Sequence, residues 1–277
     1  MKNSAKSISA FESLLREEEK QPATIEKYLR DVRAFCAFIG VSTVTKEKVV
    51  AYKQELSQKF KPAGANSRLV AINRFLDFIG KGDCRVKLLK IQRQIFAYEE
   101  KELSTVEYRR LINAAGESRI SYILQTICGT GIRVSELKYV TVEAVQNGKA
   151  VVNCKGKVRV IFFTKQVRSM LKGYMRKANI RSGSLFVTRS GKPIDRTNIW
   201  REMKALCERA NVSKDKVFPH NLRHLFARIF YSIEKDVVRL ADILGHSSIE
   251  TTRIYTIETG NMHIKSLERV SKSLIAT

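Results

Sequence analysis

The sequence is poor in acidic residues and contains no long apolar segment. Its 277 residues include 51 lysines and arginines but only 27 aspartates and glutamates, which gives a net charge of +24. No run of about 18 apolar residues occurs, so we expect no transmembrane helix. The first residues carry charge without an apolar stretch behind it, so we also expect no secretory signal.

Cysteine is scarce and irregularly spaced. The five cysteines are Cys36, Cys84, Cys128, Cys154 and Cys207, and no two of them form a Cys-x-x-Cys pair. Because their number is odd and their spacing wide, neither a disulfide framework nor a zinc site is predicted. We expect reduced thiols in a cytosolic protein that holds no metal.

The basic excess extends over the whole chain. Residues 1–100 contain 19 basic and 12 acidic residues, and residues 101–277 contain 32 and 15. An excess of this size is larger than solubility requires and predicts a polyanionic partner. A membrane-binding protein would concentrate its charge in one amphipathic stretch. A distributed basic surface instead fits a nucleic-acid backbone, so no membrane partner is expected.

The N-terminal third has the apolar periodicity of helices with basic outer faces. Apolar residues recur at helical spacing over residues 25–39, and further helices are predicted over about 45–58 and 66–79. We expect a small helical bundle, domain 1–92, whose outer faces contact the polyanion. The candidate contact residues on those faces are Lys27, Arg30, Arg33, Arg68 and Arg74.

A second domain follows an interruption of this pattern. Residues 93–103 are predicted to be a linker, and Ser104-x-x-Glu107 resembles a capping box that opens domain 104–277. Two segments rich in β-branched and aromatic residues, 149–154 and 159–163, predict a β-hairpin with a lysine-bearing turn. Further helices are predicted over about 165–178, 195–210, 220–233, 235–244 and 262–274. The expected fold class is mainly α with one small β-hairpin.

Four short motifs of the second domain contain basic residues and a tyrosine in a fixed order. They are Arg133 after Gly131, Lys155 in the hairpin turn, His220-x-x-Arg223 on one helix face, and His246 with Tyr255 nine residues later. In this order and at these spacings, the residues resemble the tyrosine recombinase (phage integrase) family. The match covers the whole second domain. The length of the first domain resembles the simple two-domain, Xer-like members.

The resemblance implies a fold and an activity. It implies a SAM-like helical core-binding domain that clamps DNA from the side opposite a mixed α+β catalytic domain. The implied activity is site-specific cutting and rejoining of duplex DNA through a covalent 3′-phosphotyrosyl intermediate, without metal, ATP or another cofactor. The implied assembly is a dimer or tetramer on paired half-sites, with the C-terminal tail exchanged between protomers. Such a protein would be cytoplasmic, and either associated with a prokaryotic nucleoid or encoded by a phage or mobile element. The implied catalytic residues are Arg133, Lys155, His220, Arg223, His246 and Tyr255.

The chemistry of these side chains agrees with those roles. The planar, permanently charged guanidiniums of Arg133 and Arg223 suit the charge that develops on a phosphate during attack. A tyrosine hydroxyl has a pKa near 10 and needs help to lose its proton, and His220 is the candidate base. Lys155 can protonate the departing 5′ oxygen, and His246 can hydrogen-bond the phosphate.

Several assignments have rivals on chemistry alone. Lys157 lies at the same predicted turn as Lys155 and is an alternative general acid as well as a DNA-contact candidate. Tyr139 and Tyr231 are alternative nucleophiles. His224 lies four residues after His220, as in zinc hydrolases.

A packing role is an alternative for His224, and two other activities are alternatives for the protein. The position of the catalytic glutamate in such a zinc motif is here Asn221, which favours a packing role for the histidine that follows. At the level of activity, the rivals are a type IB topoisomerase and a non-catalytic DNA-binding regulator. The apolar spacing within 262–274 fits a tail that packs either on its own domain or on a neighbour.

Overall fold

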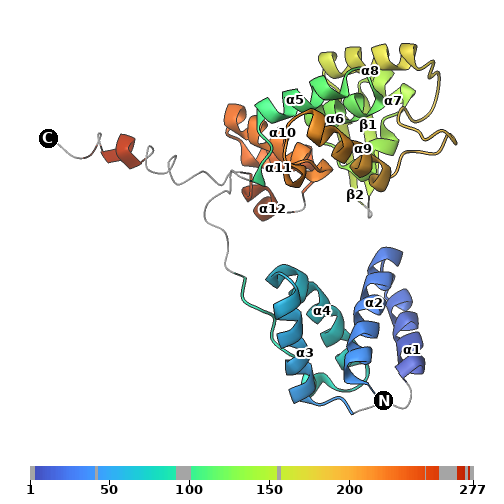
Figure 1. Ribbon diagram of the computed structural model, residues 1–277, viewed down its shortest axis with the longest axis vertical. Helices are drawn as coiled ribbons and strands as arrows, with labels where there is room; N and C mark the ends of the chain where they lie inside the picture. Colours follow the sequence, from blue (N-terminus) through green and yellow to red (C-terminus); the bar gives the residue numbers. More distant parts are fainter. Residues whose placement is uncertain are drawn as a thin grey trace. The chain divides into compact units, whose positions relative to one another are not determined.

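The chain divides into two compact units, Met1–Gln94 and Ile95–Thr277. The computed structural model describes residues 4–40, 43–91, 101–154, 157–246, 248–255, 267–271 and 274. Each unit has its own buried core. Figure 1 labels the helices and strands of both units. Within the described ranges, no helix is long and apolar enough to cross a membrane.

The first unit is a helical bundle, as the periodicity predicted. Its helices within the described ranges are α1 (Ser4–Glu17), α2 (Pro22–Ile39), α3 (Lys46–Lys59) and α4 (Pro62–Phe78). Helices α2 and α4 each begin with a proline, which suits the first turn because its missing N–H has no helical partner there. Phe35, Leu69 and Phe75 lie fully buried between the helices. Of the basic candidates, Arg30, Arg33 and Arg74 are exposed, whereas Lys27 and Arg68 are half-buried.

The segment after α4 is fastened along that helix by two asparagines. Asn73 donates to the Val86 carbonyl at 2.8 Å and accepts from its N–H at 3.0 Å. Asn66 makes the same pair of bonds with Leu89, at 2.9 and 2.7 Å. The backbone groups of Val86 and Leu89 are thus satisfied without a strand partner. The chain therefore packs on the first unit at least as far as Leu89.

The second unit is built around α6 (Arg119–Thr130), which α10 (Pro219–Glu234) packs against most extensively. The other helices of the described part are α5 (Thr105–Ala115), α7 (Val142–Asn147), α8 (Lys165–Lys177), α9 (Arg196–Arg209), α11 (Val237–Leu244) and α12 (Ile249–Arg253). A 3-10 segment, η3 (Val134–Tyr139), connects α6 to α7. The mainly α fold class is confirmed.

The hairpin pairs β1 (Lys149–Cys154) with β2 (Lys157–Phe162) in antiparallel register. Strand β2 begins at Lys157, two residues earlier than the sequence pattern predicted, because Cys154 pairs directly with Lys157. Ala150, Val152 and Ile161 are buried on one face. Arg159 pairs with Val152, so it lies on the same face as these buried residues and belongs to the site described below.

The start of the second unit agrees with the predicted capping box. The N–H of Glu107 donates to the Ser104 hydroxyl at 3.1 Å, and the Glu107 carboxylate accepts from the Ser104 N–H at 2.8 Å. Leu103 is fully buried in the second core, although the expected linker included it. Glu102 pairs with Arg228 of α10, so the chain from 101 onward packs with the second unit. Most of the expected tail helix, 262–274, lies outside the described residues.

Candidate active site

The site begins where α6 ends at Gly131. This glycine adopts φ +64°, and a Cβ placed on it would lie 2.6 Å from a ring carbon of Phe226. Only glycine meets both demands, because the left-handed region and the close contact both disfavour a side chain. After this sharp turn, η3 starts three residues later at Val134, with Arg133 as the residue that precedes it. The glycine before Arg133 is therefore a geometric requirement of the site.

Arg133 is held by a buried carboxylate one turn away. Its Nη1 donates to Glu136 Oε1 at 3.0 Å, and its backbone N–H donates to Glu136 Oε2 at 2.9 Å. Its Nη2 donates to the Gly245 carbonyl at 3.0 Å. The Arg133 side chain is still 36% exposed, whereas that of Glu136 is 2% exposed. The guanidinium thus has a fixed position and remains accessible to a ligand.

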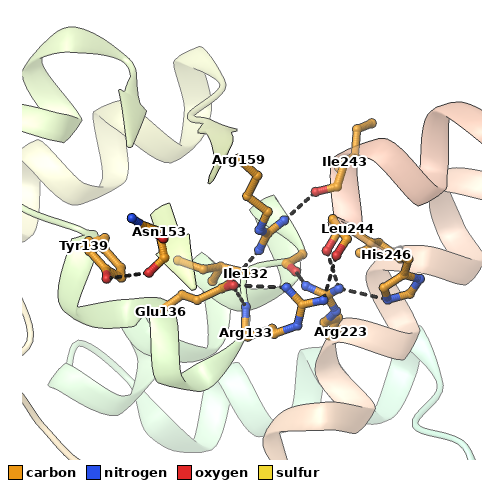
Figure 2. A network of polar contacts seen from close by, with 12 residues as sticks. Ile132, Arg133, Glu136, Tyr139, Asn153, Arg159, Arg223, Ile243, Leu244 and His246 are labelled. Carbon is orange, nitrogen blue, oxygen red and sulfur yellow. Dashed lines mark hydrogen bonds and ion pairs between the residues drawn. The ribbon is translucent and has the colours of Figure 1, made fainter. Parts of the chain in front are cut away.

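Glu136 is ionised although it is buried. Burial opposes its ionisation, but hydrogen bonds from Arg159 and Arg133 hold the pKa of this carboxyl below its usual value. Arg159 reaches it from β2 and also donates to the Ile243 carbonyl at 2.6 Å (Figure 2). One carboxylate therefore joins two arginines from different elements.

Arg223 occupies the interior of the site, and among the described residues it has no carboxylate partner. It is 2% exposed and donates to the carbonyls of Gly131 at 2.5 Å and Leu244 at 2.6 Å. Burial and the neighbouring Arg133 lower the pKa of Arg223 to about 10, so it stays charged at neutral pH. A buried cation that carbonyl dipoles, a histidine and the Tyr255 hydroxyl accompany is a site suited to an anion.

His246 follows the end of α11 and contacts Arg223. Its Nε2 lies 3.1 Å from Arg223 Nη2, and its Nδ1 lies 2.8 Å from the Thr252 hydroxyl. Burial and Arg223 lower the pKa of His246 to about 4, so the ring is neutral at pH 7. Since the arginine can only donate, Nε2 accepts and Nδ1 donates to Thr252 in this arrangement.

Tyr255 joins this cluster from the segment after α12. It is 5% exposed and packs with Leu240 and Leu244. Its ring stacks on His246 with centroids 6.0 Å apart, at an interplanar angle of 20°. Burial raises the pKa of the Tyr255 hydroxyl, while Arg223 and Arg133 act in the opposite direction. The candidate nucleophile therefore lies beside both arginines but needs a base at neutral pH.

His220 and His224 extend the cluster along α10. The two rings meet edge to face with centroids 4.3 Å apart, and His224 meets Tyr255 in the same way at 4.8 Å. His220 is exposed at the start of the helix, and burial together with Arg223 lowers its pKa. Burial and His220 lower the pKa of His224 to about 3, and its Nε2 is buried without a hydrogen-bond partner. Both rings are thus neutral at pH 7.

The lysine candidates are only partly covered by the structure. Lys155 lies outside the described residues, and Lys157 is described only as the first residue of β2. The alternative nucleophiles have other polar partners. The Tyr139 hydroxyl donates to the Asn153 carbonyl at 2.9 Å, and Tyr231 packs beside Lys235. Among the described residues, no group of three or more histidines, cysteines or acids could hold a metal ion.

The expected DNA contacts of the first unit include residues with partners inside it. Lys27 of α2 donates to the Ser67 hydroxyl of α4 at 2.6 Å. Arg74 forms an ion pair with Glu18 at the end of α1. These side chains cross-link helices, and a phosphate would have to compete with those partners.

The remaining candidates of the first unit differ in exposure. Arg30 pairs with the buried Asp31 at 2.9 Å but is 63% exposed. Arg68 lies over the Phe60 ring at 3.7 Å, and Arg33 is exposed. A DNA contact by any of them stays a prediction.

Sequence reasoning missed three residues of this site: Glu136, Arg159 and Thr252. A buried acid at the third position after an arginine resembles a capping residue, and an arginine inside a strand pattern resembles a solvated one. The role of Arg159 depends on two partners that are distant along the chain, Glu136 at 23 residues and Ile243 at 84 residues. The charge of Arg159 among the apolar residues 158 and 160–163 is the one local signal that could have indicated it.

Comparison with known proteins places this geometry in a family. The sequence profile of the phage integrase family matches residues 101–261. The tyrosine recombinase XerD of Corynebacterium glutamicum is 27% identical over 264 residues, covering 84% of this chain and 86% of that protein. The tyrosine recombinase XerA of Pyrococcus furiosus is 27% identical over 275 residues, covering 95% and 93%.

A solved structure shares the fold of the chain. The lambda integrase tetramer bound to a Holliday junction superposes with a TM-score of 0.72 at 17% identity, covering 91% of this chain and 76% of that one. The profile spans more than half of the sequence and contains the whole arginine, histidine and tyrosine cluster. The chain therefore belongs to the phage integrase family of tyrosine recombinases, the enzymes of site-specific DNA recombination.

Proposed function

We propose that this recombinase cuts DNA with Tyr255 and conserves the bond energy in a covalent 3′-phosphotyrosyl intermediate. The observation that carries the proposal is the convergence of Arg133, Arg223 and His246 on the Tyr255 ring. The tyrosine oxygen attacks the phosphorus, the bond to the 5′ oxygen breaks, and a free 5′ hydroxyl leaves. Attack of a 5′ hydroxyl on the phosphotyrosine then restores a phosphodiester and releases the enzyme.

The two arginines stabilise the charge of the reacting phosphate. Arg223 is already buried among carbonyl dipoles, so it can exchange a carbonyl for a phosphate oxygen without entering a new low-dielectric environment. Arg133 is fixed by Glu136 and the Gly245 carbonyl and remains partly exposed. Donors that are positioned before the reaction cost little reorganisation, and each contributes about 10²- to 10³-fold to the rate.

Proton transfer accompanies attack and departure. His220 has a lowered pKa and is neutral at pH 7, so it can accept the tyrosine proton directly or through a water. Lys155 supplies the proton to the departing 5′ oxygen. An approaching phosphate raises the pKa of His246 by its negative charge, which allows Nε2 to donate a hydrogen bond to it. These side chains perform the reaction without metal or ATP.

The first unit serves as the core-binding domain, over residues 1–92, and clamps the duplex against the catalytic domain, over residues 104–277. The segment 93–103 between them acts as the linker, with its last residues packed on the second unit. Lys27, Arg30, Arg33, Arg68 and Arg74 line the DNA side of the clamp, together with Lys157. The net charge of +24 supports this arrangement.

The working assembly is a tetramer on two duplexes with paired half-sites. The lambda integrase tetramer on a Holliday junction supports this stoichiometry. The tail within 262–274, with Leu267, Val270 and Leu274 at helical spacing and exposed, packs on a neighbouring protomer. The enzyme acts on chromosomal, phage or mobile-element DNA in the cytoplasm.

The test is a suicide DNA substrate whose cleaved 5′ end diffuses away, so that the covalent intermediate accumulates. Wild type should form a protein–DNA adduct, and Tyr255→Phe should form none because it lacks the attacking oxygen. Tyr231→Phe is the matched control, since this residue also packs near the same cluster and should still react. An adduct in Tyr255→Phe would identify a different nucleophile. An unreactive wild type on its cognate site would favour a DNA-binding regulator.

A further inference from the structure

Arg159 connects three segments of the catalytic unit that are distant in sequence. It lies on β2, its Nη2 pairs with Glu136 of η3, and its Nη1 donates to the Ile243 carbonyl of α11 at 2.6 Å (Figure 2). The side chain is 12% exposed. It therefore contacts DNA poorly but lies directly behind groups that surround the phosphate site.

The hydrogen bond from Arg159 to the end of α11 lies next to two others that involve active-site arginines. Ile243 accepts from Arg159, Leu244 accepts from Arg223, and Gly245 accepts from Arg133. Three consecutive carbonyls thus bind three arginines. The next residue is His246, which contacts Arg223 by its ring. A shift of this helix end would move every one of these hydrogen bonds.

Gly245 provides the space through which the Arg159 stem passes. It adopts φ +62°, and a Cβ placed on it would lie 2.4 Å from Arg159 Cδ. The glycine after α11 therefore has two functions. It ends the helix in the left-handed conformation, and it lets the arginine stem lie against the backbone.

Arg159 also shares the charge of Glu136 with Arg133. Glu136 Oε1 is bound by Arg133, and Oε2 is shared by Arg159 and the Arg133 N–H. Without Arg159, the buried carboxylate would have only one guanidinium to neutralise it. It would then draw Arg133 into a closer, two-pronged pair, since a buried unpaired charge is costly. Arg133 would become less available to a phosphate.

We propose that Arg159 is a positioning residue for the strand-cleavage reaction. It neutralises Glu136 and fastens the end of α11, so that Arg133 remains directed at the phosphate and His246 remains beside Arg223. The residue acts through others and does not itself touch the DNA. This inference rests on the proposed function for its kinetic consequence, and on the described contacts for its geometry.

The experiment compares Arg159→Met, Arg159→Lys and Arg168→Met in the full chain. Arg168 of α8 is the matched control, because it also donates to two carbonyls, those of Val145 at 3.1 Å and Gln146 at 2.6 Å, which belong to α7. Adduct formation on the suicide substrate and DNA affinity are measured for each, with thermal unfolding as the test of folding. Arg159→Met is expected to react about 10- to 100-fold more slowly. Its Kd should stay within about 3-fold of wild type, because the lost contact is not with DNA.

The variant Arg159→Lys tests whether the planar, two-sided geometry of the guanidinium is needed. An ammonium keeps the charge but cannot hold Glu136 and the Ile243 carbonyl in one plane, so Arg159→Lys should remain slower than wild type. It also serves as the folded variant if the methionine variant is too unstable to purify. Full activity in Arg159→Lys would overturn the proposal. A rate in Arg159→Met within about 3-fold of wild type, or a loss as large in Arg168→Met, would also overturn it.

A second readout does not depend on catalysis. The imidazole resonances of His246 are titrated by NMR in wild type and in each variant. Arg159 is one of the cations that lower the pKa of His246, and it holds the helix end before it, so Arg159→Met should raise that pKa. Arg168→Met should leave it unchanged. An unmoved His246 titration refutes the positioning role even if wild type forms no adduct, an outcome that would by itself refute only the proposed function.

Discussion

Glu136 gives the sharpest quantitative prediction, because its carboxylate is buried between two arginines. The substitution Glu136→Gln keeps the size of the side chain and removes its charge. The carboxylate is 2% exposed, and the partner Arg159 is 12% exposed. Loss of the charge leaves that guanidinium buried with only backbone and amide oxygens as acceptors.

The magnitude follows from the burial of both partners. Removing one member of a buried ion pair costs about 3–5 kcal/mol, and the amide recovers part of this, so we expect about 3 kcal/mol. For a unit of this size, each kcal/mol lowers the unfolding midpoint by about 2–4 °C, so the midpoint should fall by about 6–12 °C. Glu117→Gln is the control. Its pair with Lys177 is exposed, and its loss should cost under about 1 kcal/mol.

The pH dependence distinguishes an ionised Glu136 from a neutral one. Its folded pKa is held below the usual value. The advantage of wild type over Glu136→Gln is therefore fully present above the unfolded pKa of about 4.3 and is lost as the pH falls from there through the folded pKa. Thermal unfolding from pH 7 to pH 3.5 measures it. A midpoint difference below about 2 °C at pH 7 would refute the reasoning. So would a difference that already shrinks between about pH 7 and pH 5.

Two further predictions test the turn and the charge. Gly131→Ala should destabilise the protein by about 1–3 kcal/mol, because its φ is +64° and the new Cβ would meet Phe226 at 2.6 Å. Gly173→Ala in α8 meets nothing within 4 Å and should be neutral or stabilising in the same thermal unfolding assay, so equal effects would contradict the geometry. DNA affinity should fall by about 10³-fold or more between about 50 and 200 mM salt, and a nearly salt-independent Kd in a binding titration would contradict the clamp.

The helices and the hairpin could be predicted because their signals are local. The apolar period over 25–39, the Ser104-x-x-Glu107 box and the β-branched segments act through neighbours a few residues away, and the structure has the corresponding elements. The limits of these elements were less certain. Leu103 resembles a linker residue in sequence but is buried in the second core, since its burial depends on α10, more than a hundred residues later.

The order of Arg133, His220, Arg223, His246 and Tyr255 was visible in the sequence, because catalytic chemistry restricts residue type and spacing. Tertiary structure alone decided how they meet. Arg133 and the Gly245 carbonyl are 112 residues apart along the chain, and Arg223 and the Gly131 carbonyl are 92 apart. Such contacts depend on how α6, α10 and α11 pack, which no local period encodes.

The same reason explains why some charged side chains are buried and others are exposed. The sequence determined by itself that the protein is strongly basic and that a tyrosine follows an ordered set of arginines and histidines. Only the packed structure decided that Arg159 and Glu136 would be buried behind the site, whereas most other charges remain in solvent. Burial depends on what covers a residue, and here the cover comes from segments far away in sequence.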